Sequence, residues 1–413
     1  MLKIIRYNDN MQHTIKRLRL EKRISSCIKE SPVTVLLGAR QTGKTTLARL
    51  MAEKYGKAEI FDLEEAASRR ALENPETALS GLRGLVVIDE VQRLPGLFEV
   101  LRPLCDNHPA RARFLLLGSA SLTLVKGVSE SLAGRAIFVK IPGFSLDEIG
   151  AENMDRLWLR GAFPRAYLAA DTGAAIRWLD GFVSTFLERD LPQMGIKVPA
   201  GALRRFWMML AHYHGQICNF SELARAMDIS SNTARSYLDI LSGAFMLRML
   251  PPWHENIKKR QIKAPKAYFR DSGLLHLLLG VQTMRQLRSH PRYGAAWEGF
   301  ALEQILAVCG GEDAYFWSTQ RGAELDLLLI RGGKRYGFEF KSSEAPAMTR
   351  SMYIALEDLK LDSLRIIYPG TKVYKVHDKV TVVPLGMLSD GKAGSINLNP
   401  AQSNFPWRSK GTE

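Results

Sequence analysis

The segment Gly38 to Thr45, GARQTGKT, limits the folds open to this chain more than any other part of the sequence. It matches the pattern GxxxxGK[ST] and lies between the apolar run VTVLLG and a stretch with helical character. A loop of this kind directs backbone N–H groups and the positive end of a helix dipole at phosphate oxygens. The sequence therefore predicts a strand, a phosphate-binding loop and a helix within an α/β domain.

The same segment predicts the cofactors, ATP and Mg²⁺. In such a loop Lys44 reaches the β- and γ-phosphates of a nucleotide, and the Thr45 hydroxyl is a ligand of Mg²⁺. The residues that we expect to contact the nucleotide are Gly38, Arg40, Gln41, Thr42, Gly43, Lys44, Thr45 and Thr46.

Three further segments carry candidate catalytic residues. LVVIDE reads as a buried strand that ends in Asp89, a candidate Mg²⁺ ligand, and Glu90, which would polarise the attacking water and so favours hydrolysis over binding alone. Ser119, at the end of FLLLGSAS, is a candidate hydrogen-bond donor to the γ-phosphate or the water, or else part of a simple turn. Arg135, in SLAGRAIFVKIP, is a candidate arginine finger or an ordinary surface arginine.

The order of apolar and helical runs predicts the domain organisation. A chain of 413 residues exceeds what one hydrophobic core usually serves. Residues 13–30 read as a lead-in helix, and strands alternate with helices from 33 to 150, which predicts a parallel sheet covered on both faces and a first domain over 1–150. Residues 151–288 read as a helical region, and 289–388 as mixed α/β. Residues 389–413 are polar and read as a disordered tail.

Composition bears on partners and location. Lys and Arg total 57 against 42 Asp and Glu, a net charge of +15 that favours a polyanion, with nucleic acid first and an anionic membrane surface second. The sequence leaves DNA against RNA open. The four cysteines form no CxxC pair and fit a reducing cytosol. The start of the chain lacks the apolar core of a secretory signal, and the apolar runs are too short to span a membrane. We therefore expect a cytoplasmic protein.

Residues 219–250 have the apolar spacing of two short helices joined by a tight turn and followed by a strand. With the basic segment NIKKRQIK (256–263), this pattern predicts a winged helix whose second helix enters a DNA groove. A winged helix that only packs against the preceding domain would look the same. The side chains expected to point outward from the second helix are Asn232, Thr233, Arg235, Ser236 and Asp239.

Residues 324–341, ELDLLLIRGGKRYGFEFK, read as a β-hairpin around a Gly-Gly turn. If Arg331 pairs with Lys334, counting outward puts Asp326 opposite Glu339. Directly opposed side chains share one face of a sheet, so two acids would converge there.

The motifs GARQTGKTT, IDEVQRLP, LLLGSAS and SLAGR with PGFSLDE resemble AAA-type P-loop ATPases. Together with the later ELD and FEFK they resemble, over about residues 15–385, a prokaryotic family in which such an ATPase is fused to an uncharacterised C-terminal domain. The resemblance implies an ATPase core, a winged helix and a fold similar to restriction endonucleases. The hairpin resembles the PD-(D/E)xK nuclease core, although no Pro precedes Asp326. That likeness implies Mg²⁺ on Asp326, Glu339 and Glu298, with Lys341 assisting a water.

Three functions follow as hypotheses. The first is a Mg²⁺-dependent ATPase that engages DNA through its winged helix and C-terminal domain. The second is a nucleotide-controlled protein-binding switch whose nuclease-like domain is an inactive docking module. The third is a metal-dependent DNA nuclease regulated by ATP. The sequence leaves homo-oligomerisation open.

Overall fold

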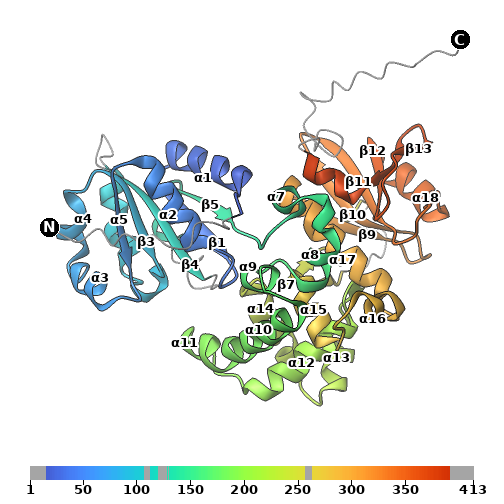
Figure 1. Cartoon of the computed structure of the whole chain (residues 1–413), viewed down its shortest axis with the longest axis horizontal. Helices are drawn as coiled ribbons and strands as arrows, with labels where there is room; N and C mark the ends of the chain where they lie inside the picture. The colour runs from blue at the N-terminus through green and yellow to red at the C-terminus, as the bar shows by residue number, and fades with distance from the viewer. Residues whose placement is uncertain (1–14, 107–111, 120–127, 129, 256–262, 391–413) are drawn as a thin grey trace, which may run out of the picture.

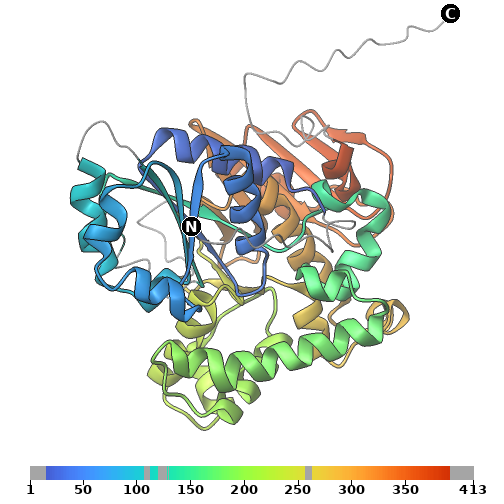
Figure 2. The same cartoon turned by 60° about the vertical axis from the view of Figure 1, so that its left-hand side comes forward.

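The structure is a computed structural model that describes residues 15–106, 112–119, 128, 130–255 and 263–390. Figure 1 shows an N-terminal α/β part in blue, a largely helical middle region in green to yellow, and a C-terminal α/β part in orange to red. The middle region lies beneath both of the others in Figure 2. Within the described residues, no helix is long and apolar enough to cross a membrane.

The first sheet contains five parallel strands in the order β2-β3-β4-β1-β5. Strand β4 therefore lies between β1, which leads into the phosphate loop, and β3, which ends in Asp89. The predicted parallel sheet is confirmed, with bounds β1 Val33–Gly38, β2 Ala58–Asp62, β3 Gly84–Asp89, β4 Ala112–Ser119 and β5 Ala136–Lys140.

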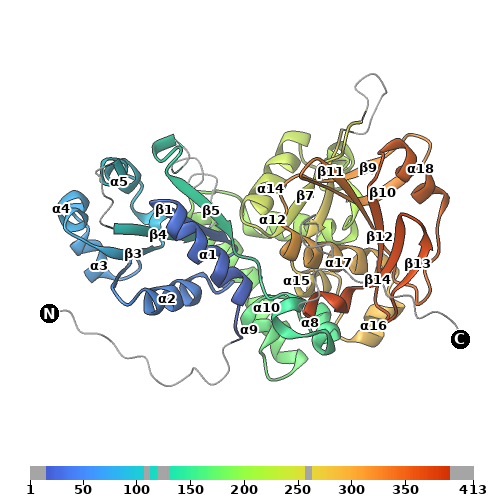
Figure 3. The same ribbon diagram turned by 90° about the horizontal axis from the view of Figure 1, so that it is seen from above.

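Helices cover both faces of this sheet because side chains alternate along strands that are buried on each side. Leu36 of β1 packs with α1 Leu18–Glu30 and α2 Lys44–Tyr55 in one cluster. Val35 and Leu37 pack in the other cluster with α5, and Figure 3 shows α2 and α5 on opposite sides of the sheet. The elements that contribute to that second cluster include α4 Pro75–Ser80, η2 Val91–Arg93 and α5 Leu97–Asp106, and the short helix α3 Ala66–Ala71 follows β2. The lead-in helix begins at Leu18, later than predicted.

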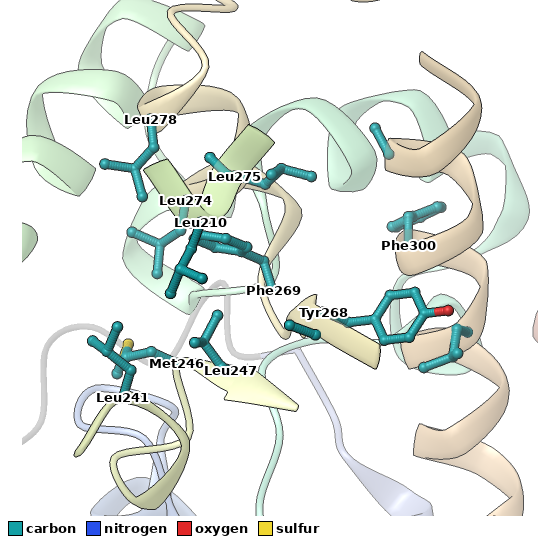
Figure 4. Packing of buried hydrophobic residues seen from close by; sticks show 14 of the residues in the cluster. Leu210, Leu241, Met246, Leu247, Tyr268, Phe269, Leu274, Leu275, Leu278 and Phe300 are labelled. Atoms are coloured by element: carbon teal, nitrogen blue, oxygen red, sulfur yellow. The ribbon is translucent and has the colours of Figure 1, made fainter. Parts of the chain in front are cut away.

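The largest hydrophobic cluster among the described residues runs from the middle region into the C-terminal part, and Figure 4 shows it around Leu210, Phe269 and Leu274. Phe206 and Trp207 are fully buried in it. The first elements of the middle region are α7 Leu146–Ile149, η3 Ala151–Asn153, α8 Met154–Arg160, α9 Pro164–Tyr167, α10 Thr172–Thr185, η4 Phe186–Asp190, α11 Leu191–Gln193 and α12 Ala200–His212.

Two short helices and a small antiparallel sheet follow α12. Helix α13 Phe220–Ala226 and helix α14 Ser231–Gly243 are joined by a turn in which Asp228 takes a positive φ of 53°. The sheet has the order β6-β8-β7. Its strands are β6 Gln216–Ile217, β7 Leu247–Leu250 and β8 Lys266–Phe269, and α15 Ser272–Leu278 and α16 Met284–Ser289 come next. The predicted wing, 256–263, lies almost entirely outside the described residues.

The C-terminal part is a six-stranded mixed sheet in the order β13-β14-β12-β11-β10-β9. Helix α17 Tyr293–Cys309 packs in the cluster on one face and α18 Arg350–Asp358 in the cluster on the other. The hairpin register is as counted, with Arg331 paired to Lys334. The remaining elements are β9 Ala314–Ser318, β10 Glu324–Arg331, β11 Lys334–Phe340, β12 Ser363–Tyr368, β13 Tyr374–His377, β14 Val380–Pro384 and η5 Leu385–Asp390. Of the predicted tail, residues 391–413 lie outside the described residues.

Candidate nucleotide-binding site

The loop between β1 and α2 has the backbone of a phosphate cradle. Gln41 and Gly43 take positive φ angles of 65° and 88°, which turns successive backbone N–H groups toward one side. A Cβ at Gly43 would meet no atom within 4 Å, so the space beside the loop is open. At Gly38 a Cβ would collide with the carbonyl oxygen of Ile141, so only glycine fits there.

Lys44 lies buried at the start of α2. Its ammonium donates to the carbonyl oxygens of Gly38, at 3.1 Å, and Ala39, at 2.8 Å. Burial lowers the pKa of Lys44 to about 8, although the carboxylates of Glu90 and Asp89 act in the opposite direction. A buried ammonium held by carbonyls of its own loop suits an anionic phosphate.

Thr45 and Asp89 join the loop to the end of β3. The Thr45 hydroxyl donates to Asp89 Oδ2 at 2.6 Å, and Asp89 Oδ1 accepts from the Glu90 N–H at 2.9 Å. Protein sites usually hold Mg²⁺ with one or two protein oxygens plus substrate phosphates rather than with a full protein cage. The pair therefore fits Mg²⁺ that arrives with a nucleotide.

Glu90 is half-buried directly after β3 and has a positive φ of 54°. Its carboxylate accepts a hydrogen bond from the side-chain amide of Gln92. Burial, and next the charge of Asp89, raise the pKa of Glu90 above its usual value. A carboxylate with a raised pKa beside the phosphate loop can take a proton from a water.

Of the other residues predicted to contact the nucleotide, Thr42 lies within the phosphate loop, whereas Thr46 and Ser119 lie beside it. Thr42 is buried and its hydroxyl donates to Ala39 O at 3.0 Å, whereas Thr46 is exposed on the first turn of α2. Ser119 ends β4 directly beside Gly38 of β1. The Ser119 backbone is thus at the carboxyl edge of the sheet, and its side chain lies outside the described residues.

Arg135 does not lie at this site. The backbone carbonyl of Arg135 accepts from Val33 N at 3.1 Å, at the amino end of β1, whereas the phosphate loop follows the carboxyl end. Six residues of strand separate the two edges, roughly 20 Å at about 3.3 Å per residue. Its guanidinium instead forms an ion pair with Asp106 at 2.6 Å. Arg135 is therefore too far from the phosphate loop of its own chain to contact a nucleotide there, and its role as an arginine finger stays a prediction.

Arg17, which the sequence did not single out, is a buried residue that anchors the loop. Its guanidinium donates to Thr42 O at 3.1 Å and to Gly143 O at 2.7 Å, and it pairs with Glu148 at 2.8 Å. It thereby ties the phosphate loop to the segment after β5. Among the basic residues of 13–30 nothing local distinguishes it, because its partners come from distant parts of the chain.

Arg40 was expected to contact the nucleotide, and its guanidinium is already paired. It forms an ion pair with Asp190, at the end of η4, and lies 3.2 Å from Glu64. Asp190 is buried, with 3% of its side chain exposed. The loop is therefore linked directly to the middle region, and the sequence offered no signal for Asp190.

The hairpin brings the C-terminal candidates together. Phe340 N donates to Asp326 Oδ2 at 2.9 Å, and Lys341 Nζ donates to Glu339 Oε2 at 2.8 Å. Throughout the part of the chain that the structure describes, no three His, Cys, Asp or Glu side chains are grouped so as to hold a metal ion. Two of the three predicted Mg²⁺ ligands have lysine partners, since Lys266 forms an ion pair with Glu298 and Lys341 forms one with Glu339. Binding of Mg²⁺ by Glu298, Asp326 and Glu339 stays a prediction.

Family models match three consecutive parts of the chain. Residues 30–150 match a model described as an AAA domain. Residues 151–285 and 293–388 match models described as domains of unknown function, DUF8612 and DUF4143. The AAA match covers the five-stranded parallel sheet and the loop described above, and it supports ATP binding and hydrolysis by this part.

Among solved structures, similarity is partial. The Walker-type ATPase paby2304 of Pyrococcus abyssi is 15% identical with a TM-score of 0.46, covering 64% of this chain and 96% of that one. AMPPCP-bound DnaA from Aquifex aeolicus is 16% identical with a TM-score of 0.29, covering 54% and 86%. Similarities of this size carry no inference about function.

Two relatives match nearly the whole chain. They are "Uncharacterized protein Rv2008c" of Mycobacterium tuberculosis and "Uncharacterized protein Mb2031c" of Mycobacterium bovis. Each is 47% identical over 370 residues, which cover 90% of this chain and 84% of the relative. The chain therefore belongs to the same family as these two mycobacterial proteins, and its residues 30–150 form an AAA-type P-loop ATPase domain.

Proposed function

We propose that this protein is a Mg²⁺-dependent ATPase whose nucleotide state controls engagement of DNA. The observation that carries the proposal is the 2.6 Å hydrogen bond between Thr45 and Asp89. It joins the phosphate loop to the acidic end of β3, where both residues would share the shell of one Mg²⁺ ion. Bound ATP would supply the phosphoanhydride bond, and Mg²⁺ would supply positive charge that neutralises its phosphates.

The chain's own residues then have separate tasks. Lys44 exchanges the carbonyls of its loop for the β- and γ-phosphates, and the N–H groups around Gly43 bind phosphate oxygens. Glu90 orients a water and accepts its proton, for which its raised pKa is suited. Ser119 is the proposed donor to the γ-phosphate from β4.

Arg135 enters this proposal only through a second copy of the chain. It lies at the edge of the sheet opposite the phosphate loop, so it reaches a nucleotide only if the amino edge of one subunit faces the carboxyl edge of the next. That head-to-tail contact is heterologous and closes into a ring when its rotation permits. The proposed domains keep the bounds 1–150, 151–288 and 289–388.

The arrangement of α12 to β8 supports a winged helix as the DNA-binding element. Helix α14 buries Ala234, Tyr237 and Leu238 against the core and exposes Asn232 and Arg235. A second helix with an exposed polar face suits a major groove. The net charge of +15 adds sequence-independent attraction to phosphates.

The test is the rate of ATP hydrolysis with and without DNA across a salt series. We expect turnover that requires Mg²⁺, is lost in Lys44→Ala, and is stimulated by DNA at low salt but less at high salt. If the rate of ATP hydrolysis is the same with and without DNA at every salt concentration, the proposed engagement of DNA is contradicted, whereas the proposed ATPase activity is not.

A protein-binding switch is the second candidate, and the link between Arg40 and Asp190 favours it. A nucleotide in the loop would act on Arg40 and hence on the middle region, whatever that region binds. Nucleotide-dependent changes in the middle region without DNA stimulation would favour the switch. A nuclease is not proposed, because Lys266 and Lys341 pair with Glu298 and Glu339, two of the acids that would hold its metal ion.

A further inference from the structure

Lys266 lies in an unusual place for a lysine. It begins β8 in the small sheet of the middle region, and only 5% of its side chain is exposed. Its ammonium lies 3.7 Å from Glu298 Oε1 on α17 and 3.7 Å from Glu324 Oε2 on β10. A lysine from the middle region thus reaches into acids of the C-terminal part.

The acids around Lys266 differ in exposure. Asp326 and Glu339 are buried, 18% of the Glu298 side chain is exposed, and Glu324 is half exposed. Lys266 itself is buried, and a buried ammonium needs acidic partners because burying an unpaired charge is costly.

We propose that the carboxylate cluster of Glu298, Glu324, Asp326 and Glu339 is a cation site whose cation is the chain's own Lys266 ammonium. The site fastens the middle region to the C-terminal part and excludes a divalent metal ion. It includes Glu298, Asp326 and Glu339, the acids to which the nuclease resemblance assigns Mg²⁺. The proposal does not depend on the ATP site.

A second contact from β8 reinforces the docking. The Tyr268 hydroxyl donates to Glu298 Oε1 at 2.6 Å, and Figure 4 shows the ring extending from β8 toward α17. Residues two apart on a strand share one face, so Lys266 and Tyr268 approach the same carboxylate together. One strand of the middle region thus supplies both an ammonium and a hydroxyl to a single acid.

Lys341 supplies a second ammonium to the cluster. Its ammonium donates to Glu339 Oε2, while Glu339 Oε1 is buried and has no hydrogen-bond partner among the described residues. Two ammonium ions therefore contact the acids, Lys266 at Glu298 and Glu324 and Lys341 at Glu339. Displacing Lys266 would leave a buried ammonium without its acids, which is costly.

The decisive experiment measures Mn²⁺ binding without nucleotide by the electron paramagnetic resonance signal of free Mn²⁺. All variants carry Asp89→Asn, which removes the candidate metal-binding carboxylate near the phosphate loop. We expect the Asp89→Asn variant to bind no Mn²⁺, so that the added ion stays free. The double variant with Asp89→Asn and Lys266→Ala should bind one Mn²⁺ ion per chain. Adding Asp326→Asn should abolish that binding.

Two results would overturn the proposal. The first is that the Asp89→Asn protein binds Mn²⁺ and loses this binding when Asp326→Asn is added. Nicking of supercoiled DNA that is present in the first protein and lost in the second would strengthen this result. The second is a folded Lys266→Ala protein that binds no Mn²⁺. The first result can be obtained even if Lys266→Ala fails to fold.

Thermal melting tests the docking itself. Lys266→Met should lower the melting temperature by several degrees because it leaves buried carboxylates without their cation. Adding Glu298→Gln should recover part of that loss, and Lys263→Ala, at an exposed lysine three residues earlier, should change little. Equal melting temperatures for Lys266→Met and Lys263→Ala would contradict a docking role.

Discussion

The guanidinium of Arg40, in the phosphate loop, forms an ion pair with Asp190, which lies 150 residues later at the end of η4. Asp190 also accepts from Arg189 at 3.2 Å, so two guanidinium groups hold one buried carboxylate. The phosphate loop and the middle region are therefore not independent bodies, and a change in either one acts on a shared ion pair.

This pair gives the first prediction, on stability. Asp190→Ala should destabilise the protein by about 1–3 kcal/mol because it leaves the half-buried Arg40 without its main partner. Glu64→Gln is the matched control, since Glu64 contacts the same guanidinium but is 47% exposed, and such pairs contribute about 0–1 kcal/mol. Denaturant melts measure both. Similar losses in the two variants would show that the buried pair has no special role.

The second prediction separates binding from turnover. Lys44→Ala should lose nucleotide binding because it removes the ammonium that faces the phosphates. Glu90→Gln should bind ATP normally but hydrolyse it about 100-fold or more slowly, since an amide cannot accept the proton of water. A fluorescent nucleotide reports binding and phosphate release reports turnover. Equal loss of binding in both variants would contradict the assigned roles.

The third prediction concerns pH. The pKa of Lys44 in the nucleotide-free fold is about 8, below its usual value of 10.5. Bound phosphates favour the ammonium and raise this pKa, so binding takes up a proton once the pH exceeds about 8. ATP affinity should thus be flat below pH 8 and fall roughly tenfold by pH 9.

The same shift fixes the sign of a stability effect. Because the folded pKa of Lys44 lies below the unfolded value, the unfolded chain binds more protons between about pH 8 and 10.5, and this group's contribution to stability rises with pH there. Lys44→Met should remove that rise. If the affinity for ATP stays constant from pH 7 to 9.5, the pKa of Lys44 is not lowered as stated.

The fourth prediction addresses DNA. Arg235, exposed on α14 and stacked 4.6 Å from the ring of Phe220, is a candidate phosphate contact. Arg235→Ala should weaken binding and reduce the slope of log affinity against log salt by about 0.9 for each phosphate that the arginine neutralises. Asp239→Asn, on the exposed side of the same helix, should strengthen binding. Unchanged slopes in both variants would locate the DNA surface elsewhere.

Local sequence patterns were sufficient for much of the fold. The glycines and Lys44 of the phosphate loop predicted the strand, loop and helix that the structure has, because each follows from neighbours within a few residues. The Gly-Gly turn predicted the pairing of Arg331 with Lys334, since the turn itself sets the register.

The residues that the sequence missed act over long distances. Arg17 contacts Gly143, and Lys266 contacts Glu298, so their roles exist only once separate elements have packed. The place of Arg135 was open to inference, because a residue just before a strand of a parallel sheet lies at the amino edge, away from the loops that bind ligands.

The last prediction tests whether Arg135 acts across a subunit interface. Arg135→Ala should bind ATP as the parent protein does, because the side chain lies at the opposite edge of its own sheet, where it pairs with Asp106. If a neighbouring subunit supplies the arginine, turnover should fall by about 1,000-fold or more, as for arginine fingers elsewhere. Mixing Arg135→Ala with Lys44→Ala should then restore hydrolysis, since one variant keeps an intact nucleotide site and the other keeps the arginine. Lys54→Ala, which removes an exposed ammonium at the end of α2 that pairs with Glu21, replaces Lys44→Ala in a control mixture. If the mixture of Arg135→Ala and Lys44→Ala hydrolyses no faster than its components, the arginine serves only its pair with Asp106.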